Sequence, residues 1–394
     1  LRVSPIVLAR AAKLAASRDC TLVVCHSHPF PGAVRASSID IKTETELCGR
    51  VLPGRLRGRP VGALILGPDG TDGRVWREGR PDRLFVSVGG ARLGGELRSN
   101  LSELDDRDSR QLLVWGSAGQ SRLRHSSVAV VGAGGTGSHV VTQLAHLGIG
   151  RFVIVDHDLV ERSNLSRLIG ATTDDVGRAK VEVLADAVHR IRSDASVECI
   201  AESLLDIDAK RLAVCDVVVG CTDTHGSRAL LTELSAQYHL PYVDLGVEVQ
   251  GAGQYTRAGG GVRVIRPGDP CLHCMRVLDP ALVREEFLTD SERHVEAARG
   301  YLRGAAEPEP SVVSLNGVVG SLACVEVIDV LLGLFGSAPR RLLYRAELRA
   351  VSTASVARDE HCYVCGLEGI SGVGDGRSLP RRVQGSLRGS VACL

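Results

Sequence analysis

The sequence predicts an α/β fold in which a doubly wound, mostly parallel sheet is preceded by a smaller α+β region. Three observations support this prediction. From Ser127 onward, short buried-strand patterns alternate with helical patterns. A glycine-rich turn stands between the first of these strands and the first helix, as in nucleotide-binding sheets. Residues 1–95 differ, because their short strand patterns are separated by strong turns.

The N-terminal region is expected to mix helix and sheet. Residues 7–17 have helical spacing and good helix formers. Strands are expected at 21–25, 61–66 and 83–88. Residues 96–126 are expected to form a linker and the first helix of the next domain, with a helical pattern over 102–114.

Residues 127–366 supply the alternating elements of the larger sheet. Strands are expected at 127–131, 152–155, 197–201, 212–219 and 242–245, and helices at 139–147, 180–192, 227–238 and 314–334. Such alternation implies parallel strands joined by helical crossovers. The charged residues 280–310 predict a mobile crossover, and the tail, residues 367–394, is rich enough in Gly, Ser and Arg to predict disorder.

Composition narrows the classes of function. The chain has 394 residues, a formal net charge of +1 and no long basic run, so nucleic acid is not the expected partner. No apolar stretch is long enough to predict a membrane span, and no secretion signal opens the sequence. Four of the 12 cysteines form two CxxC pairs, which favours thiols and metal over disulfides. We therefore expect a cytoplasmic protein without a membrane partner.

The turn after the first strand of the larger sheet has the sequence VVGAGGTGS, residues 130–138. Missing side chains let a backbone approach phosphates, and the following helix supplies N–H donors and a positive dipole end. Asp156 ends the next strand, where an acidic side chain accepts hydrogen bonds from ribose hydroxyls. To this point an NAD-dependent oxidoreductase fits equally well. The glycines concerned are Gly132, Gly134, Gly135 and Gly137.

The residues that follow favour ATP. Asp158, Asn164, Arg167 and Lys180 place two cations and an amide just beyond the ribose position. An adenylating enzyme needs such groups, because charge develops on the α-phosphate and on the departing pyrophosphate. Hydride transfer has no such need. Asp223 is expected at the carboxyl end of a later strand, where a carboxylate suits Mg²⁺.

These residues resemble the ThiF/MoeB/ubiquitin-activating superfamily, over a stretch from about Ser102 to Gly366. The resemblance implies a Rossmann-like sheet that adenylates the C-terminal carboxylate of a ubiquitin-like or sulfur-carrier protein ending in Gly-Gly. It also implies a homodimer in which Arg110 reaches the partner's ATP. Catalytic roles would fall to Arg110, Asn164, Arg167, Lys180 and Asp223. Nucleotide contacts would further involve the four glycines, Asp156, Asp158, Ser163, Leu165, Ser166 and Thr224.

The substrate is less narrowly defined than the chemistry. Within the same superfamily, the acyl group can also be an amino acid attached to tRNA or a small peptide. No cysteine lies between Met275 and Ala323, which argues against an enzyme-bound thioester in the usual crossover position. The carrier protein, the final acceptor and the pathway stay open.

Two CxxC pairs predict a structural zinc site. Cys271 and Cys274 lie about ninety residues before Cys362 and Cys365. Four thiolates can close a tetrahedral cage around Zn²⁺ with no open position for water. The alternative is a set of reduced, metal-free cysteines or a redox pair.

A second group of metal-binding residues lies near the N-terminus. His26 and His28 end an expected strand and are followed by Ser37 and Asp40. Two histidines and a carboxylate leave a fourth position on Zn²⁺ for water, as in catalytic zinc sites. This pattern resembles the JAB/MPN metalloprotease motif, which assigns Ser37 to oxyanion stabilisation.

The glutamate expected upstream of that motif is missing. Residues 1–25 contain no Glu, and Glu44 and Glu46 come after the histidines. The sequence therefore predicts a partial JAB/MPN domain that either lacks peptidase activity or continues from an earlier natural start.

Overall fold

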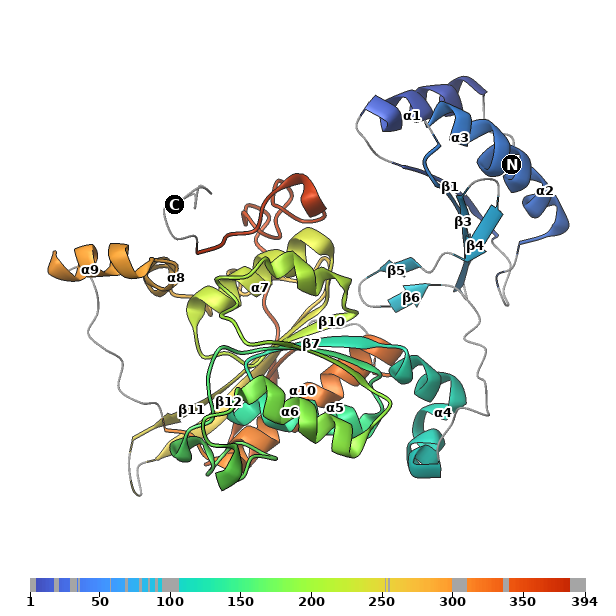
Figure 1. Ribbon diagram of the computed structural model, residues 1–394. Coiled ribbons are helices and arrows are strands. Elements are labelled where there is room, and N and C mark those ends of the chain that lie inside the picture. Colours follow the sequence, from blue (N-terminus) through green and yellow to red (C-terminus); the bar gives the residue numbers. More distant parts are fainter. Residues whose placement is uncertain are drawn as a thin grey trace. The chain divides into compact units, whose positions relative to one another are not determined.

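The computed structural model describes residues 5–382 except 18–20, 29–33, 35, 57, 68–69, 78–79, 84–85, 89–90, 94–105, 252, 254–255, 300–309 and 336–339. The chain divides into two compact units, Leu1–Arg98 and Ser99–Leu394. Each unit has a sheet of its own with helices packed on it (Figure 1).

The N-terminal unit is built on a four-stranded sheet in the order β1-β2-β3-β4. Its strands are β1 Leu22–Ser27, β2 Val61–Gly67, β3 Gly70–Arg77 and β4 Arg80–Arg83, and only β1 and β2 are parallel. The helices are α1 Pro5–Ser17, α2 Ser38–Glu46 and α3 Leu52–Arg55, with a π-helical stretch Leu47–Val51 before α3. Two short strands, β5 Val86–Val88 and β6 Ala91–Leu93, pair separately. The strand expected at 83–88 is thus divided between β4 and β5.

The C-terminal unit contains an eight-stranded sheet in the order β14-β13-β12-β11-β10-β7-β8-β9. The five strands from β9 to β11 are parallel, and β12, β13 and β14 continue the sheet in antiparallel fashion. Strands rich in valine form its centre, because they are buried on both faces. The strands are β7 Ser127–Val131, β8 Arg151–Val155, β9 Ser196–Ile200, β10 Val217–Gly220, β11 Tyr242–Gln250, β12 Arg257–Ile265, β13 Arg340–Arg345 and β14 Ala350–Ala354.

Helices cover both faces of this sheet, as expected for a doubly wound fold (Figure 1). Helices α5 Gly135–Leu147, α6 Lys180–Ile191 and α10 Val313–Leu332 share one hydrophobic core with the sheet, and α7 His225–Tyr238 packs in a second core on the opposite face. The remaining helices are α4 Ser109–Arg124, which is kinked at Gly116, α8 Pro280–Glu286 and α9 Asp290–Ala298.

Helix α10 is the most apolar helix that the structure describes. By length and composition alone it would reach across a membrane, and 56% of its most apolar window is buried inside the unit. Val319, Ala323 and Val327 lie in the core that α10 shares with α5 and the sheet. Burial of this kind is typical of a core helix in an α/β domain.

Several elements differ in extent from those that the sequence predicts. The helix expected at 139–147 begins at Gly135, directly after the glycine turn. The strand expected at 212–219 is divided into a 3₁₀ helix, Ala209–Val214, and β10, because Asp208 caps the turn before the apolar run. The charged crossover contains α8 and α9, whose first residues are preceded by the caps Asp279 and Thr289.

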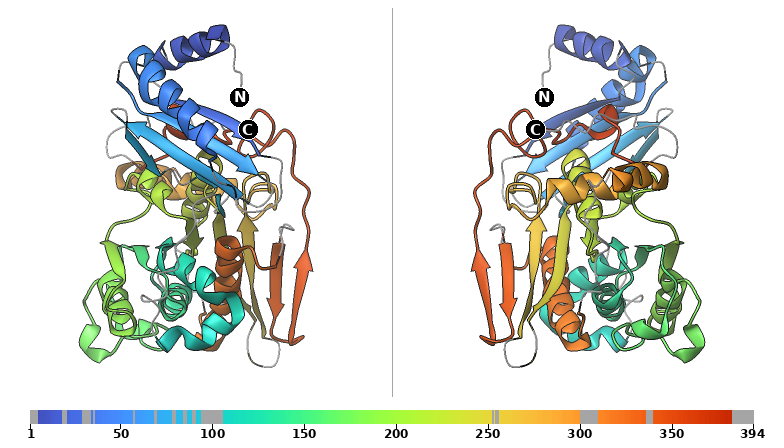
Figure 2. Two further views of the ribbon diagram at one scale, coloured as in Figure 1. Left: turned by 90° about the vertical axis from the view of Figure 1, so that its right-hand side faces the viewer. Right: turned by 90° about the vertical axis from the view of Figure 1, so that its left-hand side faces the viewer.

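The antiparallel edge of the larger sheet was not predicted. In Figure 2, β13 and β14 are drawn in orange at this edge. Beyond β14, residues 367–382 of the predicted tail pack on the same unit. Ile370 is buried beside the cysteines, and the guanidinium of Arg382 pairs with Asp206 at 2.6 Å.

Candidate active site

The glycine turn joins β7 to α5 at the carboxyl edge of the parallel strands. Gly132 has φ +96°, a left-handed conformation that few other residues adopt, and a Cβ there would lie 2.5 Å from the carbonyl oxygen of Cys221. The first residue of α5 is Gly135, so the N–H groups of the first helical turn open directly onto this turn. This arrangement suits phosphate binding.

The side chain of Asp156 connects the turn after β7 with the turn after β8. Its Oδ2 accepts a hydrogen bond from the backbone N–H of Ala133 at 2.6 Å, and its Oδ1 accepts one from Asp158 at 2.8 Å. Each carboxylate oxygen has a second lone pair, so both can still accept hydrogen bonds from ribose hydroxyls. The position beyond β8 therefore fits the ribose role expected from the sequence.

Lys180 and Asp158 form an ion pair beside this position. The Lys180 Nζ lies 2.7 Å from Asp158 Oδ2, and Lys180 is 8% exposed. A backbone bridge between Leu159 and Ala179 brings the two residues together. Burial acts to raise the pKa of Asp158, but the hydrogen bond and charge of Lys180 outweigh it and hold the pKa below its ordinary value. The ion pair thus fixes the position of the lysine.

The segment Ser163–Arg167 forms a tight turn whose polar groups bond to one another. Asn164 is buried, and its Oδ1 accepts from the backbone N–H of Glu161 at 3.1 Å. Arg167 donates to the carbonyl of Ser163 at 2.9 Å, and its Cδ lies 3.5 Å from the position of a Cβ on Gly135. The structure therefore brings Arg167 against the nucleotide turn, whereas Asn164 shapes the loop that carries it. Leu165 and Ser166 belong to the same loop.

Asp223 and Thr224 lie one strand further along the same edge. Asp223 is exposed and follows β10, and Thr224 precedes the first residue of α7. The Thr224 Oγ1 is buried and has no hydrogen-bond partner in the described part of the chain. A carboxylate and an unpaired hydroxyl are oxygen ligands of the kind that Mg²⁺ prefers.

Arg110 stands apart from these residues. It lies in the first turn of α4, is exposed, and makes no ion pair among the described residues. The structure therefore gives Arg110 no contact with the nucleotide turn of its own chain.

A buried cluster of charged residues near β10 was not predicted from the sequence. Asp244 is fully buried and receives Arg263 at 2.6 Å, Arg228 at 3.2 Å and the hydroxyl of Tyr242 at 3.0 Å. Arg341 lies opposite Arg263 in the register of β12 and β13, and burial and the charge of Arg263 lower the pKa of Arg341. Since Asp244 pairs with Gly220 in the sheet register, the cluster lies next to the strand end that carries Asp223.

Comparison with known proteins identifies the family of this unit. The model of the ThiF family matches residues 108–364, about two-thirds of the chain. The chain belongs to the ThiF family. The resemblance to E1-like adenylyltransferases inferred from the glycine turn and the residues after it is thereby confirmed.

Individual relatives cover the same ThiF unit. The SAMP-activating enzyme E1 of Haloferax volcanii is 32% identical over 275 residues, which cover 68% of this chain and 92% of that enzyme. The molybdopterin-synthase adenylyltransferase of Escherichia coli K12 is 30% identical over 274 residues, covering 68% and 100%. The adenylyltransferase and sulfurtransferase MOCS3 of Drosophila willistoni is 29% identical over 290 residues. These residues cover 71% of this chain and 58% of the Drosophila protein.

Solved structures share the fold of the ThiF unit. The crystal structure of E. coli MccB with ATP has a TM-score of 0.52 at 23% identity, covering 67% of this chain and 75% of MccB. This likeness concerns the fold alone. It agrees with the predicted α/β class, a parallel sheet covered by helices.

Four cysteines of the ThiF unit gather at the ends of β12 and β14. The sulfur atoms of Cys271 and Cys362 are 3.6 Å apart, and those of Cys274 and Cys365 are 3.4 Å apart. All four lie within 4.8 Å of one another. Tetrahedral Zn²⁺ with bonds of about 2.3 Å requires sulfur separations of about 3.8 Å, so the four side chains fit a zinc ion.

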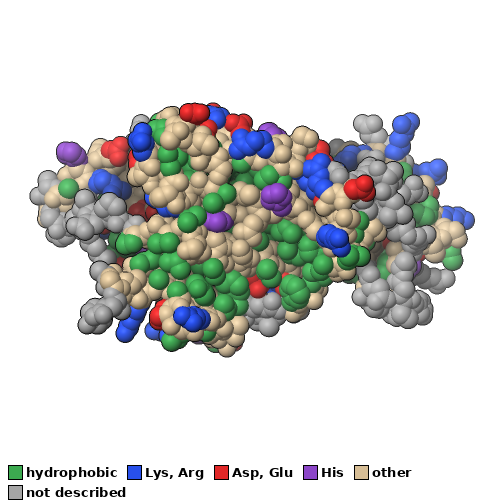
Figure 3. Space-filling view, turned by 90° about the horizontal axis from the view of Figure 1, so that it is seen from below, with side chains coloured by type: hydrophobic (Ala, Val, Ile, Leu, Met, Phe, Trp, Pro, Cys, Tyr) green, Lys and Arg blue, Asp and Glu red, His purple; other side chains and the backbone are tan. Residues whose placement is uncertain are grey.

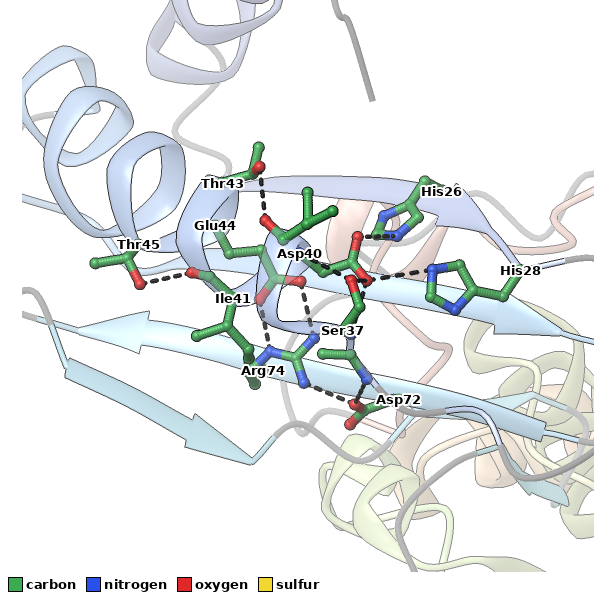
Figure 4. A network of polar contacts seen from close by, with 12 residues as sticks. His26, His28, Ser37, Asp40, Ile41, Thr43, Glu44, Thr45, Asp72 and Arg74 are labelled. Atoms are coloured by element: carbon green, nitrogen blue, oxygen red, sulfur yellow. Dashed lines mark hydrogen bonds and ion pairs between the residues drawn. The ribbon is translucent and has the colours of Figure 1, made fainter.

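His26, His28 and Asp40 come together in the N-terminal unit (Figure 4). The Nε2 atoms of the two histidines lie 3.1 and 3.3 Å from the two oxygens of Asp40. Ser37 caps α2, and its Oγ donates to Asp40 Oδ2 at 2.6 Å. Ligand atoms at metal distances of about 2.0–2.2 Å are separated by similar lengths, so this trio also fits a metal ion.

Glu44 is occupied by a different interaction. Arg74 binds both of its carboxylate oxygens, at 2.5 and 2.8 Å, and both side chains are buried (Figure 4). Arg74 also pairs with Asp72 at 2.8 Å, and Asp72 accepts from the backbone N–H of Ala36. Glu44 therefore holds α2 against β3 and is not free to act as a base. The resemblance to the JAB/MPN domain stays a prediction.

Proposed function

We propose that this chain uses ATP to adenylate the C-terminal carboxylate of a ubiquitin-like or sulfur-carrier protein. The observation that best supports the proposal is that Asp156 and Arg167 lie against the glycine turn of a ThiF unit. The Lys180–Asp158 pair is joined to Asp156 through the backbone N–H of Asp158. One carboxylate oxygen attacks the α-phosphorus, a new O–P bond forms, and the bond to the pyrophosphate oxygen breaks. The products are an acyl-adenylate and pyrophosphate.

The side chains act on this reaction through charge and alignment. The attacking carboxylate is already ionised near pH 7, so no general base is required. Lys180 and Arg167 offset the charge that develops on the phosphates, and Asn164 maintains the loop that carries Arg167. Asp156 holds the ribose. Asp223, with Thr224 beside it, would hold Mg²⁺, which supplies further neutralisation of phosphate charge when bound.

The relatives favour a protein substrate over the alternatives. One relative is a SAMP-activating enzyme and another a molybdopterin-synthase adenylyltransferase, and both are at least 30% identical to this chain. The resemblance to the superfamily leaves a small peptide, or an amino acid attached to tRNA, as a second candidate substrate. Membership in the ThiF family disfavours the NAD-dependent oxidoreductase.

Pyrophosphate exchange tests the proposal. The purified chain is incubated with ATP, labelled pyrophosphate and a small carrier protein that ends in Gly-Gly. Label should enter ATP only when the carrier is present. Exchange with a free peptide and none with the carrier would favour the second candidate, and NAD reduction without exchange would overturn the proposal.

A homodimer would bring Arg110 to the ATP of the partner. Arg110 is exposed in the first turn of α4, and Leu113 and Val114 in the next turn are 79% and 70% exposed. Val318 and Val325 of α10 are exposed as well. Figure 3 shows many hydrophobic side chains on the face of the molecule seen from below. Exposed apolar side chains near an exposed arginine suit a self-complementary interface.

Mixing two inactive variants tests the shared site. We expect R110A and K180A to lose exchange separately, because each lacks one cation at the phosphates. Equal mixing of the two should restore about a quarter of wild-type activity, since half of the dimers are mixed and one of their two sites is intact. Exchange that stays absent after mixing, with subunit exchange verified by size, would place Arg110 in its own chain's site.

We further propose that the N-terminal unit binds one metal ion through His26, His28 and Asp40. The separations among their ligand atoms and the JAB/MPN-like pattern support this assignment. A metal held there supplies Lewis-acid activation of water. Glu44 does not provide the base for that water while it is paired with Arg74.

Metal content tests this second site. We expect the wild-type chain, loaded with zinc and desalted, to retain about two equivalents, one at the cysteines and one at the histidines. H26A/H28A should retain about one equivalent. The double variant H189A/H294A removes two exposed histidines elsewhere and should retain both ions. Equal zinc content in all three proteins would exclude the histidine site.

A further inference from the structure

Asn316 lies against the nucleotide turn, although it belongs to the apolar helix α10. The residue is 2% exposed and sits in the first turn of that helix. A Cβ built on Gly135 would lie 2.2 Å from its Nδ2 and 3.5 Å from the Cδ of Arg167. Asn316, Arg167 and the start of α5 therefore meet at one point. Only a glycine at position 135 leaves room for the amide.

The amide nitrogen of Asn316 has an unused donor. It donates one hydrogen bond to Ser311 Oγ at 3.1 Å. A primary amide carries two N–H donors, and the second has no acceptor among the residues that the structure describes. A buried donor without an acceptor is unfavourable unless a ligand or water completes it. The first turn of α10 adds the N–H groups and positive dipole end of a 20-residue helix.

The packing of α10 on α5 fixes the position of this amide. The ring of His139, from α5, is 3.0 Å from the position of a Cβ on Gly317, and a Cβ on Gly320 would lie 3.1 Å from the His139 Cβ. Burial lowers the pKa of His139, while a hydrogen bond to the backbone of Val313 acts in the opposite direction. A neutral ring thus joins α5 to the first turn of α10. Asn316 is held at the nucleotide turn before any ligand arrives.

We propose that Asn316 donates its second N–H to a phosphate oxygen of bound ATP, so that α10 contributes to the triphosphate site together with α5 and the Arg167 loop. The inference rests on the proposed function, because it requires ATP at the glycine turn. It goes beyond that function by adding a binding residue from the helix that directly follows the crossover.

Equilibrium binding of ATP and of adenosine tests the proposal without a carrier protein. The variants are N316D, which preserves shape and adds a charge, and N316L, which preserves volume and removes both donors. S314D places the same charge on an exposed position of the same turn and serves as the matched control. Circular dichroism and thermal melting are measured for every variant.

The expected losses of affinity depend on whether the ligand carries phosphates. ATP affinity should fall at least about tenfold in N316D, because a carboxylate repels phosphate, and about threefold to tenfold in N316L. Adenosine affinity should stay within about twofold of wild type in both, since adenosine has no phosphate. S314D should resemble wild type for both ligands.

Two other patterns would overturn the inference. Unchanged ATP affinity in N316L would mean that the amide contacts no phosphate, and this readout holds even where N316D fails to fold. Equal loss of ATP and adenosine affinity would assign Asn316 a purely structural role. Failure of the wild-type chain to bind ATP at all would overturn the proposed function as well, and so distinguishes the two claims.

Discussion

Replacing Lys180 by alanine is expected to lower carrier-dependent pyrophosphate exchange by about 10²–10³-fold, the loss typical of one charge-stabilising group in an active site. The ammonium is fixed by Asp158 at 2.7 Å and is almost fully buried, so water cannot readily replace its charge. Exchange of labelled pyrophosphate into ATP measures the effect. The fold should persist, because the core beneath α6 consists of Val181, Leu184 and Val188.

Lys210 provides the matched control. It also pairs with an aspartate, Asp375, at 2.8 Å, but its side chain is 51% exposed and lies outside the site. K210A should exchange at the wild-type rate. Exchange by K180A within a factor of about three of wild type would remove Lys180 from the phosphate-binding group.

The double variant C271S/C274S is expected to lose its zinc and much of its stability. Serine hydroxyls bind Zn²⁺ poorly, and two remaining thiolates cannot close a tetrahedral cage. The free energy of metal binding contributes to folding, so we expect the melting temperature to fall by about 10 °C or more. Atomic absorption and differential scanning calorimetry measure the two effects.

Cys199 provides the control for this change. It is exposed and belongs to β9, away from the four clustered thiols. C199S should keep its zinc and its melting temperature. A C271S/C274S protein that retains the zinc of its ThiF unit, with the histidine site removed by H26A/H28A, would exclude the four-cysteine site.

The parallel part of the fold was predictable because its signal is local. Strands such as β7 and β10 are runs of valine buried on both faces, and each is followed by a turn and a helical pattern. The antiparallel edge lacks such a signal. Strand β12 contains three consecutive glycines, and β13 has arginines at both ends, so neither segment has the apolar run of a central strand.

The candidate site was predictable where its residues belong to one motif. It was less predictable where residues far apart in the sequence come together in space. Asp156, Arg167 and Lys180 follow the glycine turn within fifty residues, and their order indicates their chemistry. Arg228 follows Asp223 by five residues, but Asp244, with which it pairs, and Arg263, which pairs with the same aspartate, come from later strands. Asn316 lies inside the helix expected at 314–334, and only the packing of α10 on α5 places it at Gly135.

The same distinction applies to the N-terminal unit. The spacing of His26 and His28 on one strand indicated a shared metal, and α2 brings Asp40 to them. The ion pair between Glu44 and Arg74 could not be inferred from the sequence, because Arg74 comes thirty residues later and belongs to β3.

The four-cysteine cluster joins two points of the chain with the whole crossover and α10 between them. Once a metal is bound, a protease cut anywhere between Cys274 and Cys362 leaves two fragments that are still tied together through sulfur. Such a nicked protein would run as one species in native electrophoresis and as two in denaturing gels that contain a chelator. The segment between the two CxxC pairs could therefore be cleaved, exchanged or lengthened by insertion while both of its ends stay held at the metal.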